Sequence, residues 1–225
     1  EALPISFCDH LDVMNTRKET EEGKGSCLGR PLPDISIKLF PVSSSPFAPD
    51  IKELQNGKVG EICVSGPTVT EEYYQMPGAT LDSKFKKENK TYHRIGDLGY
   101  FDSNGNLRFL GRKAERIKTA SGPLETETCE PIVNTIEGVQ RSALIGIGDK
   151  SPKEACIVIE PSRGFQNKKS REVIRQKILE KLHLSWPQHK IERVLFEKSL
   201  PVDARHNAKI HRLALAKKWT NKLCR

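Results

Sequence analysis

The stretch "NKTYHRIGDLGYFDSNGNLRFLGRKAERIKT", residues 89–119, alternates apolar with polar residues and then ends in a cluster of Arg and Lys. Its centre predicts a β-hairpin, because Asn104 and Gly105 are residues that adopt positive φ and stand between two alternating flanks. Asp97 and Arg112 each follow a glycine. Taken alone, Asp97 is typical of a turn-capping residue and Arg112 of a strand end, so a structural role stays open at this point.

The rest of the chain divides into two parts at this stretch. Residues 1–112 are β-rich, with the strand candidates "ISIKLFPV" and "KVGEICVSG". Residues 113–225 contain the strand candidates "VQRSALIGIG", "EACIVIEP" and "IERVLFEKSLP" together with two amphipathic segments. We therefore expect a mixed α+β fold, in which the second part is a separate α/β domain with a three-stranded sheet and helices.

The two amphipathic segments predict helices. In "SREVIRQKILEKLHL" we expect Ser170 to cap the helix and one face to be buried. That face comprises Val173, Ile174, Ile178 and Leu182. The last helix, in "AKIHRLALAKKWTNKLC", is expected to bury Ile210, Leu213 and Trp219.

Charge is distributed unevenly. Residues 1–112 carry 14 Lys and Arg against 16 Asp and Glu, whereas residues 113–225 carry 23 against 13. The basic part is compatible with nucleic acid, anionic lipid, a phosphorylated ligand or a plain solvated surface. It has neither zinc-ligand spacing nor interleaved aromatic and basic residues, so we expect no specific nucleic-acid binding. Weak contact of the basic last helix with a membrane surface remains an alternative.

The six cysteines include no Cys-x-x-Cys pair, and no Cys/His spacing typical of zinc occurs. Several lie in apolar runs, which favours buried free thiols and a reducing, cytoplasmic compartment. No apolar run approaches the roughly 20 residues of a membrane-spanning helix.

Four motifs in order along the chain resemble one superfamily. They are "GKGSCLGRPLPDISIKLF", "GKVGEICVSGPTVTEEYYQMPGAT", "YHRIGDLGYFDSNGNLRFLGRK" and "PVDARHNAKI". Together they are similar to the AMP-forming adenylating enzymes, which include acyl-CoA synthetases, luciferases and peptide-synthetase adenylation domains. The resemblance implies a small β-barrel-like subdomain within residues 1–112, which ends the large domain, and a mobile C-terminal domain at 113–225, joined by a hinge.

The resemblance also implies roles for individual residues. Asp97 would accept the ribose hydroxyls of ATP, and Arg112 would contact the ribose and phosphate region. Lys113 falls at the hinge, and Lys209 would be the catalytic lysine that bridges charge in the adenylation step. Glu1 matches the end of a motif that supplies a Mg²⁺ ligand, so ATP and Mg²⁺ are the expected cofactors.

The phosphate-binding loop and the acyl pocket of the superfamily lie upstream of the matched motifs, and residues 1–225 contain no comparable glycine-rich loop. We therefore expect this sequence to be the C-terminal fragment of a bacterial ligase. Its partners would be a fatty acid, ATP and the missing upstream part of its own chain. We expect the fragment alone not to adenylate an acid.

Departures from the common motifs point to a subgroup. Ile95 replaces the usual Thr, His93 the usual aromatic residue, and Ala114 an acidic residue. "GRKAERI", "GPLETETCEP" and "PVDARHNAKI" together resemble the β-lactone synthetases of bacterial olefin synthesis. These enzymes adenylate a β-hydroxy fatty acid, whose own hydroxyl then closes a lactone. The altered "TASGPLETETCE" loop makes CoA use doubtful, and a fatty acyl-CoA ligase is the alternative.

Overall fold

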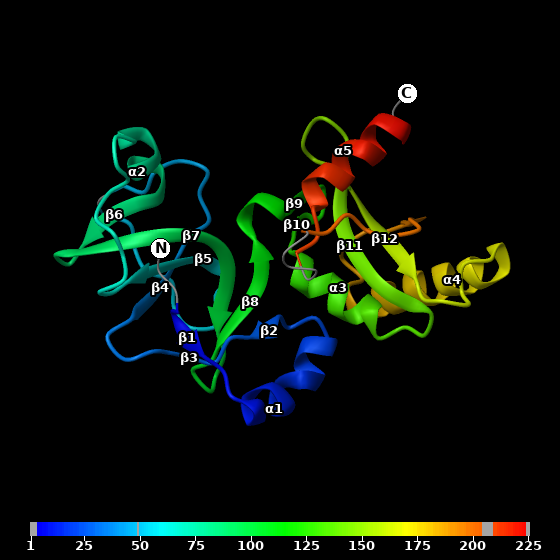
Figure 1. The fold of residues 1–225 in the computed structure, drawn as a ribbon, viewed down its shortest axis with the longest axis horizontal. Coiled ribbons are helices and arrows are strands. Elements are labelled where there is room, and N and C mark those ends of the chain that lie inside the picture. Colours follow the sequence, from blue (N-terminus) through cyan, green and yellow to red (C-terminus); the bar gives the residue numbers. More distant parts are fainter. Residues whose placement is uncertain (1–3, 49, 204–208, 224–225) are drawn as a thin grey trace. The chain divides into compact units, whose positions relative to one another are not determined.

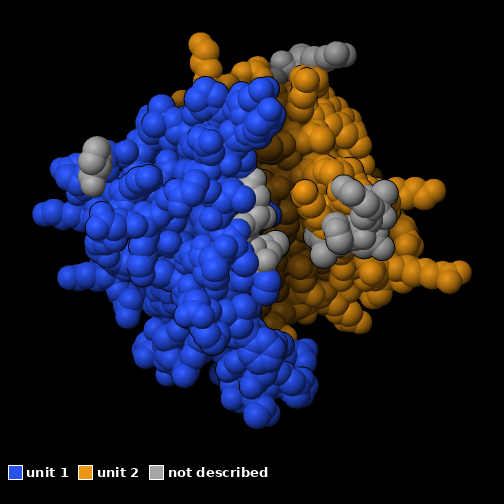
Figure 2. All heavy atoms as spheres, turned by 60° about the vertical axis from the view of Figure 1, so that its left-hand side comes forward, with its two compact units in different colours: residues 1–18, 25–114 blue, residues 19–24, 115–225 orange. Residues whose placement is uncertain are grey.

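The structure is a computed structural model with mixed α/β architecture (Figure 1). The residues that it describes are 4–48, 50–203 and 209–223. They form five α-helices and four sheets. The chain divides into two compact units, coloured separately in Figure 2. Unit 1 comprises residues 1–18 and 25–114, and unit 2 comprises residues 19–24 and 115–225.

Unit 1 is built on a six-stranded antiparallel sheet. Its strands are β2 (Ser26–Cys27), β4 (Ser36–Phe40), β5 (Gly60–Ser65), β6 (Lys84–Lys87), β7 (Lys90–Phe101) and β8 (Leu107–Arg112). The order is β2-β8-β7-β5-β4, and β6 also pairs with β7. A two-stranded sheet, β1 (Ser6–Phe7) with β3 (Arg30–Pro31), and the helix α2 (Pro77–Ser83) complete the main elements. The helix α1 (His10–Glu21) crosses the unit boundary, because its residues from 19 onward belong to unit 2.

The predicted hairpin is confirmed, because β7 and β8 pair on either side of the turn. Only Gly105 has positive φ, at 79°, and the expectation that Asn104 shares this conformation was wrong. The turn is held instead by Asp102, whose Oδ1 accepts hydrogen bonds from the backbone N–H groups of Asn104 and Asn106 at 2.9 Å each. A side-chain acceptor thus replaces the second positive-φ residue.

The central strand β5 is buried along its whole length. Ile62 and Val64 point into one hydrophobic cluster, while Cys63 belongs to another with Phe40 and Tyr92. Because side chains alternate along a strand, Glu61 lies on the same face of β5 as Cys63. A carboxylate in the interior of the sheet requires partners of opposite charge.

Unit 2 is built on a three-stranded sheet. Its strands are β11 (Val139–Ile147), β12 (Glu154–Pro161) and β13 (Arg193–Phe196). β11 pairs antiparallel with β12, and β12 pairs parallel with β13 through the crossover helix α4 (Lys168–Ser185). The other elements are the short helix η1 (Lys113–Glu115, which crosses the unit boundary), the hairpin of β9 (Ile117–Thr119) and β10 (Gly122–Leu124), α3 (Thr126–Asn134) and α5 (Arg212–Leu223).

The sheet of unit 2 is covered on both faces. Leu144 of β11 packs into the hydrophobic cluster formed with α3 and α4. Its neighbours Ala143, Ile145 and Ile147 pack into a second cluster with Leu215 and Trp219 of α5. The two clusters therefore follow the alternation of side chains along the strand.

The cap of α4 and the buried faces of α4 and α5 differ in part from the sequence predictions. Asn167 caps α4 by accepting the Ser170 N–H at 2.9 Å, so Ser170 lies inside the helix. Ile174, Ile178 and Leu182 are buried as expected, but Val173 is 46% exposed. In α5 the buried residues include Leu215 and Trp219, whereas Leu213 is 60% exposed. Ile210 is buried just before the helix begins.

The five cysteines in the described part of the chain are all free. Cys63, Cys129 and Cys156 are buried, as their apolar surroundings predict. Among the described residues, no helix combines the length and apolar character needed to span a membrane.

Candidate functional site

Asp97 of β7 and Arg112 of β8 are direct partners in the strand register. Arg112 Nη1 lies 3.0 Å from Asp97 Oδ1 and donates a hydrogen bond to the Ile95 carbonyl at 3.3 Å. The Arg112 side chain is 55% exposed and that of Asp97 is 19% exposed. The structure thus brings these two predicted site residues together as an ion pair.

The backbone around Asp97 is shaped locally. Gly96 has a φ of 78°, and a Cβ added there meets open space, so the glycine serves the backbone conformation and not close packing. The register of β7 against β8 shifts between Leu98 and Gly99, directly after Asp97. A bulge of this kind re-aims side chains and interrupts regular pairing.

Lys113, the predicted hinge residue, has an anchored side chain. Its Nζ donates to Glu61 Oε1 at 2.7 Å and to the Ser43 carbonyl at 3.2 Å. The ammonium therefore helps to neutralise the buried carboxylate of Glu61. The hinge role of Lys113 stays a prediction.

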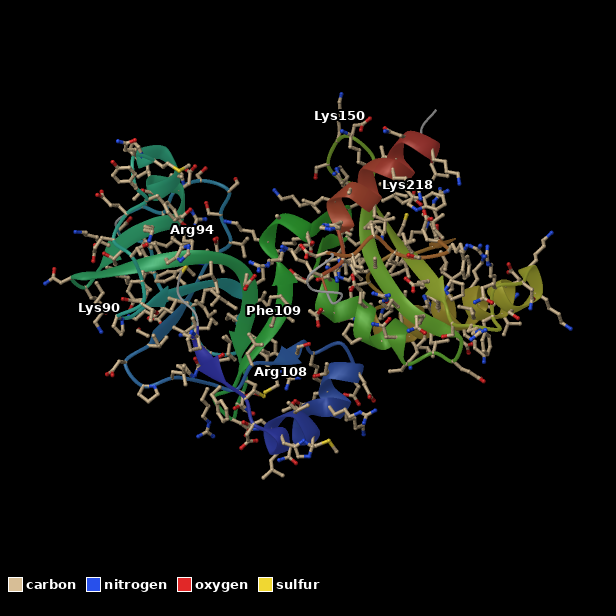
Figure 3. All side chains as sticks on the ribbon, viewed as in Figure 1. Lys90, Arg94, Arg108, Phe109, Lys150 and Lys218 are labelled. Carbon is tan, nitrogen blue, oxygen red and sulfur yellow. The ribbon has the colours of Figure 1, made fainter. Side chains whose placement is uncertain are left out.

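Arg94 is the second partner of Glu61. Its Nε and Nη2 donate to the two carboxylate oxygens at 3.1 and 2.9 Å. The remaining donors reach the carbonyls of Ser43, Ser45 and Asp82 at 2.7 to 3.0 Å. Figure 3 labels Arg94 on β7. One buried carboxylate therefore serves two cations, an arrangement that sequence reasoning missed.

Lys209 belongs to unit 2. It precedes Ile210, which forms an isolated antiparallel bridge with Val202. The Lys209 carbonyl accepts the Asp203 N–H at 2.9 Å, and the His211 N–H donates to the Pro201 carbonyl at 2.9 Å. Ile210 is buried while Lys209 is exposed, as alternation in an extended segment requires.

Arg212 lies three residues beyond Lys209, at the start of α5. Its Nε and Nη2 donate to the two oxygens of Glu130 at 2.7 and 2.6 Å, and its Nη1 donates to Glu115 at 3.1 Å. Burial opposes the charged guanidinium, but hydrogen bonding to Glu130 raises the pKa of Arg212 above its ordinary value. Burial raises the pKa of Glu130, and the hydrogen bonds from Arg212 oppose that shift.

The segment that departs from the superfamily pattern, residues 119–130, forms the turn and second strand of the β9–β10 hairpin and the first part of α3. Ser121 at the tip of the hairpin borders a cavity of about 420 Å³ in unit 2. The other lining residues are Leu182, His183, Pro187, Gln188, His189, Lys190, Ile191 and Glu192. The Nδ1 atom of His189 is buried and has no hydrogen-bond partner among the described residues.

The predicted magnesium ligand, Glu1, lies outside the described residues. Within the part of the chain that the structure describes, no group of three or more His, Cys, Asp or Glu side chains is placed to hold a metal ion. The described residues therefore provide no protein cage for Mg²⁺. An ion held mainly by phosphate oxygens requires few protein ligands.

No protein-family model matches the sequence. The chain is 36% identical over 224 residues to the olefin beta-lactone synthetase of Stenotrophomonas maltophilia, covering 96% of this chain and 40% of that protein. The chain belongs to the AMP-forming adenylating superfamily. It is also 31% identical over 155 residues to a long-chain-fatty-acid–CoA ligase of Salmonella typhimurium, covering 69% of this chain and 25% of that protein.

A solved member of the superfamily supports the fold. ATP-bound MatB from Rhodopseudomonas palustris matches with a TM-score of 0.69 at 23% identity, covering 87% of this chain and 36% of that chain. At this identity the likeness concerns the fold alone. The present chain spans about two fifths of the length of the curated olefin beta-lactone synthetases that it matches.

Proposed function

We propose that the full-length protein is an ATP-dependent, AMP-forming ligase that adenylates a long-chain β-hydroxy fatty acid and closes it to a β-lactone. The observation that carries this proposal is the similarity to olefin beta-lactone synthetase along 96% of the chain. The ion pair of Asp97 with the exposed Arg112 gives the proposal a local chemical basis.

Asp97 and Arg112 would hold the nucleotide. A carboxylate can accept hydrogen bonds from both ribose hydroxyls, and Asp97 is held beside Arg112. Among the described residues, Arg112 contacts Asp97 and the Ile95 carbonyl through one nitrogen, so its fork can offer other donors to ribose or phosphate oxygens. The exposure of the Arg112 side chain keeps these donors accessible.

Lys209 would stabilise the charge that develops during adenylation. In that step a carboxylate oxygen of the fatty acid attacks the α-phosphorus of ATP, and pyrophosphate leaves. An exposed ammonium on a flexible stem suits a group that must contact several oxygens and then withdraw. The paired segments 201–203 and 209–211 support this role by holding the lysine's backbone in place.

The second step would need no thiol. The β-hydroxyl oxygen of the bound substrate attacks the acyl carbonyl carbon, AMP leaves, and the hydroxyl proton is lost to solvent or a base. The product is a four-membered lactone. The altered sequence of the β9–β10 hairpin favours this outcome over transfer to CoA.

In the same proposal, the β-rich sheet of unit 1 is the barrel-like subdomain that ends the large domain, and Lys113 is the hinge. A hinge requires residues that absorb changes in φ and ψ. The anchoring of Lys113 to Glu61 would then fix the unit 1 side of that hinge. MgATP is the expected co-substrate.

A fatty acyl-CoA ligase is the second candidate. The similarity to the long-chain-fatty-acid–CoA ligase of Salmonella typhimurium favours it, although it covers 69% of the chain compared with 96%. Both candidates share the adenylation step and differ only in the nucleophile that displaces AMP. They are therefore separated by their products.

The test uses the full-length protein with MgATP and a long-chain β-hydroxy fatty acid, with and without CoA, and identifies products by mass spectrometry. We expect AMP and a β-lactone without CoA. The fatty acid of equal length that lacks the β-hydroxyl is the matched control, which should yield no lactone. Acyl-CoA formed only when CoA is present would overturn lactone closure in favour of the second candidate.

A further inference from the structure

Arg212 occupies a junction of three segments of unit 2. Its guanidinium connects Glu130 of α3 and Glu115 at the beginning of the unit. The same Glu130 also accepts the Leu144 N–H of β11 at 2.8 Å. The side chains of Arg212, Glu115 and Glu130 are all at least 84% buried, because none is more than 16% exposed.

The segment that carries Lys209 enters this junction directly. Ile210 is fixed in the hydrophobic cluster of α5, and Arg212 follows it with its backbone N–H donating to the Ile210 carbonyl at 3.0 Å. The backbone from Lys209 to Arg212 is therefore held in place by the burial of Ile210 and by the ion pairs of Arg212. The Lys209 side chain is exposed, and its backbone carbonyl accepts the hydrogen bond from the Asp203 N–H.

Glu115 is the third charged residue of this junction. It is the first residue of unit 2 after the segment that ends at Ala114. Its contact with Arg212 spans 97 residues of sequence, so the start of the unit and the lysine segment are joined by one side chain. A buried bidentate guanidinium fixes orientation more strictly than an ammonium does.

We propose that Arg212 is a positioning residue for Lys209, coupling the lysine segment to Glu115 so that Lys209 moves as one body with the chain that leaves Lys113. The inference rests on the proposed function, because it assumes that Lys209 acts in adenylation. It adds a residue that touches neither acid nor nucleotide. Arg212 acts through the backbone of the segment from Lys209 to Arg212.

The test uses the full-length protein and two variants. Glu115→Gln weakens one arm of the junction and leaves the bidentate pair with Glu130. Arg212→Lys keeps the positive charge but removes the planar guanidinium that donates to both oxygens of Glu130. Glu197→Gln is the matched control, because the Glu197 side chain is as little exposed as that of Glu115 and pairs at 2.6 Å with Lys218 of α5, away from the junction. Figure 3 labels Lys218.

The first readout separates turnover from binding. Misplacement of a catalytic group by about 1 Å costs up to 100-fold in rate, so we expect Glu115→Gln and Arg212→Lys to lower kcat for ATP–pyrophosphate exchange by about 10- to 100-fold. The KM for ATP should stay close to that of the Glu197→Gln control. The melting temperature should fall, most in Arg212→Lys, because that change disturbs the buried pair with Glu130. Hydrogen exchange at the Asp203 and His211 amides should become faster in both variants.

Lys209→Ala is measured in parallel to separate the two proposals. If it lowers exchange but Glu115→Gln and Arg212→Lys do not, the positioning role is overturned and the function stands. If both junction variants lose kcat only in proportion to their loss of folded protein, the positioning role is likewise overturned. If Lys209→Ala leaves exchange unchanged, the role of Lys209 in the proposed function fails, and the positioning role fails with it.

Discussion

Asp97 and Arg112 face each other across β7 and β8, with Arg112 Nη1 3.0 Å from Asp97 Oδ1. Because the arginine is 55% exposed, the pair contributes little to stability, in the range of roughly 0–1 kcal/mol for surface ion pairs. A structural role and a ligand-binding role therefore make different predictions for substitution. If the pair is only structural, substitution should lower the melting temperature slightly. If the pair binds the nucleotide, substitution should raise the KM for ATP strongly.

Asp97→Asn in the full-length protein should raise the KM for ATP by about 10- to 100-fold, because a hydrogen bond to a charged group is worth about 1.5–3 kcal/mol. Its melting temperature should change little. Glu88→Gln is the matched control, since Glu88 forms an exposed ion pair with Lys38 in the same unit. Steady-state kinetics with varied ATP gives the answer, and an unchanged KM would contradict the ribose role.

Glu61→Gln should destabilise the protein strongly. It leaves the buried Arg94 and the half-buried Lys113 without their shared carboxylate, and loss of one partner of a buried ion pair costs about 3–5 kcal/mol. Lys113→Met should cost less, because Arg94 still neutralises Glu61. Urea unfolding of the full-length protein measures the order. Glu154→Gln, in an exposed pair with Arg193, should cost under about 1 kcal/mol.

An equal effect of Glu61→Gln and Glu154→Gln would contradict the assignment of Glu61 as a buried shared partner. A larger effect of Lys113→Met than of Glu61→Gln would contradict it as well. In that case Arg94 would not compensate the carboxylate alone.

His189 should make stability depend on pH. Burial lowers the pKa of His189 below its ordinary value of 6.5, so the folded protein binds this proton less readily than the unfolded chain. Its contribution to stability is therefore present above about pH 6.5 and is lost as pH falls through the lowered folded pKa. His189→Gln should reduce the loss of melting temperature between roughly pH 7.5 and pH 5, the range in which histidine titrates.

His183→Gln is the control for that measurement, because His183 is exposed on the rim of the same cavity. Its melting temperature is measured at the same pH values. Identical profiles for His189→Gln and the parent protein would contradict the assigned effect of His189.

The buried thiols should resist alkylation. Burial raises the pKa of both Cys129 and Cys156 to about 12, so at pH 8 each is protonated as well as shielded. Cys27 is only half-buried and should react with iodoacetamide before Cys129 and Cys156 do. Peptide mapping after timed labelling measures the relative labelling rates of these cysteines. Unfolding in urea should abolish the difference between the rates. Labelling of Cys129 as fast as Cys27 in the native protein would contradict the packing of α3.

Local sequence patterns predicted several features well. The alternation on both sides of Gly105 and the spacing of turn glycines predicted the β7–β8 hairpin, and the apolar strand candidates predicted the sheet of unit 2. These features depend on neighbours in sequence. The pairing of Asp97 with Arg112 was not predicted, although it results from the register of that same hairpin.

Long-range pairing was not accessible in the same way. Glu61 is separated from Arg94 by 33 residues and from Lys113 by 52, and no periodic pattern links them. The only signal was a carboxylate inside the apolar strand "GEICVSG". The cap of α4 was missed for a different reason, because Asn167 and Ser170 are both good capping residues and only the backbone decides between them.

Glu130 also affects how the protein avoids aggregation. β11 lies at the edge of its three-stranded sheet and contains the apolar run "ALIGI", a combination that invites pairing with another chain. Because the Glu130 carboxylate occupies the Leu144 N–H, and Thr220 accepts the Gly148 N–H beyond the strand at 3.2 Å, this edge is partly blocked. Loss of Glu130 would therefore open a template for intermolecular strand addition.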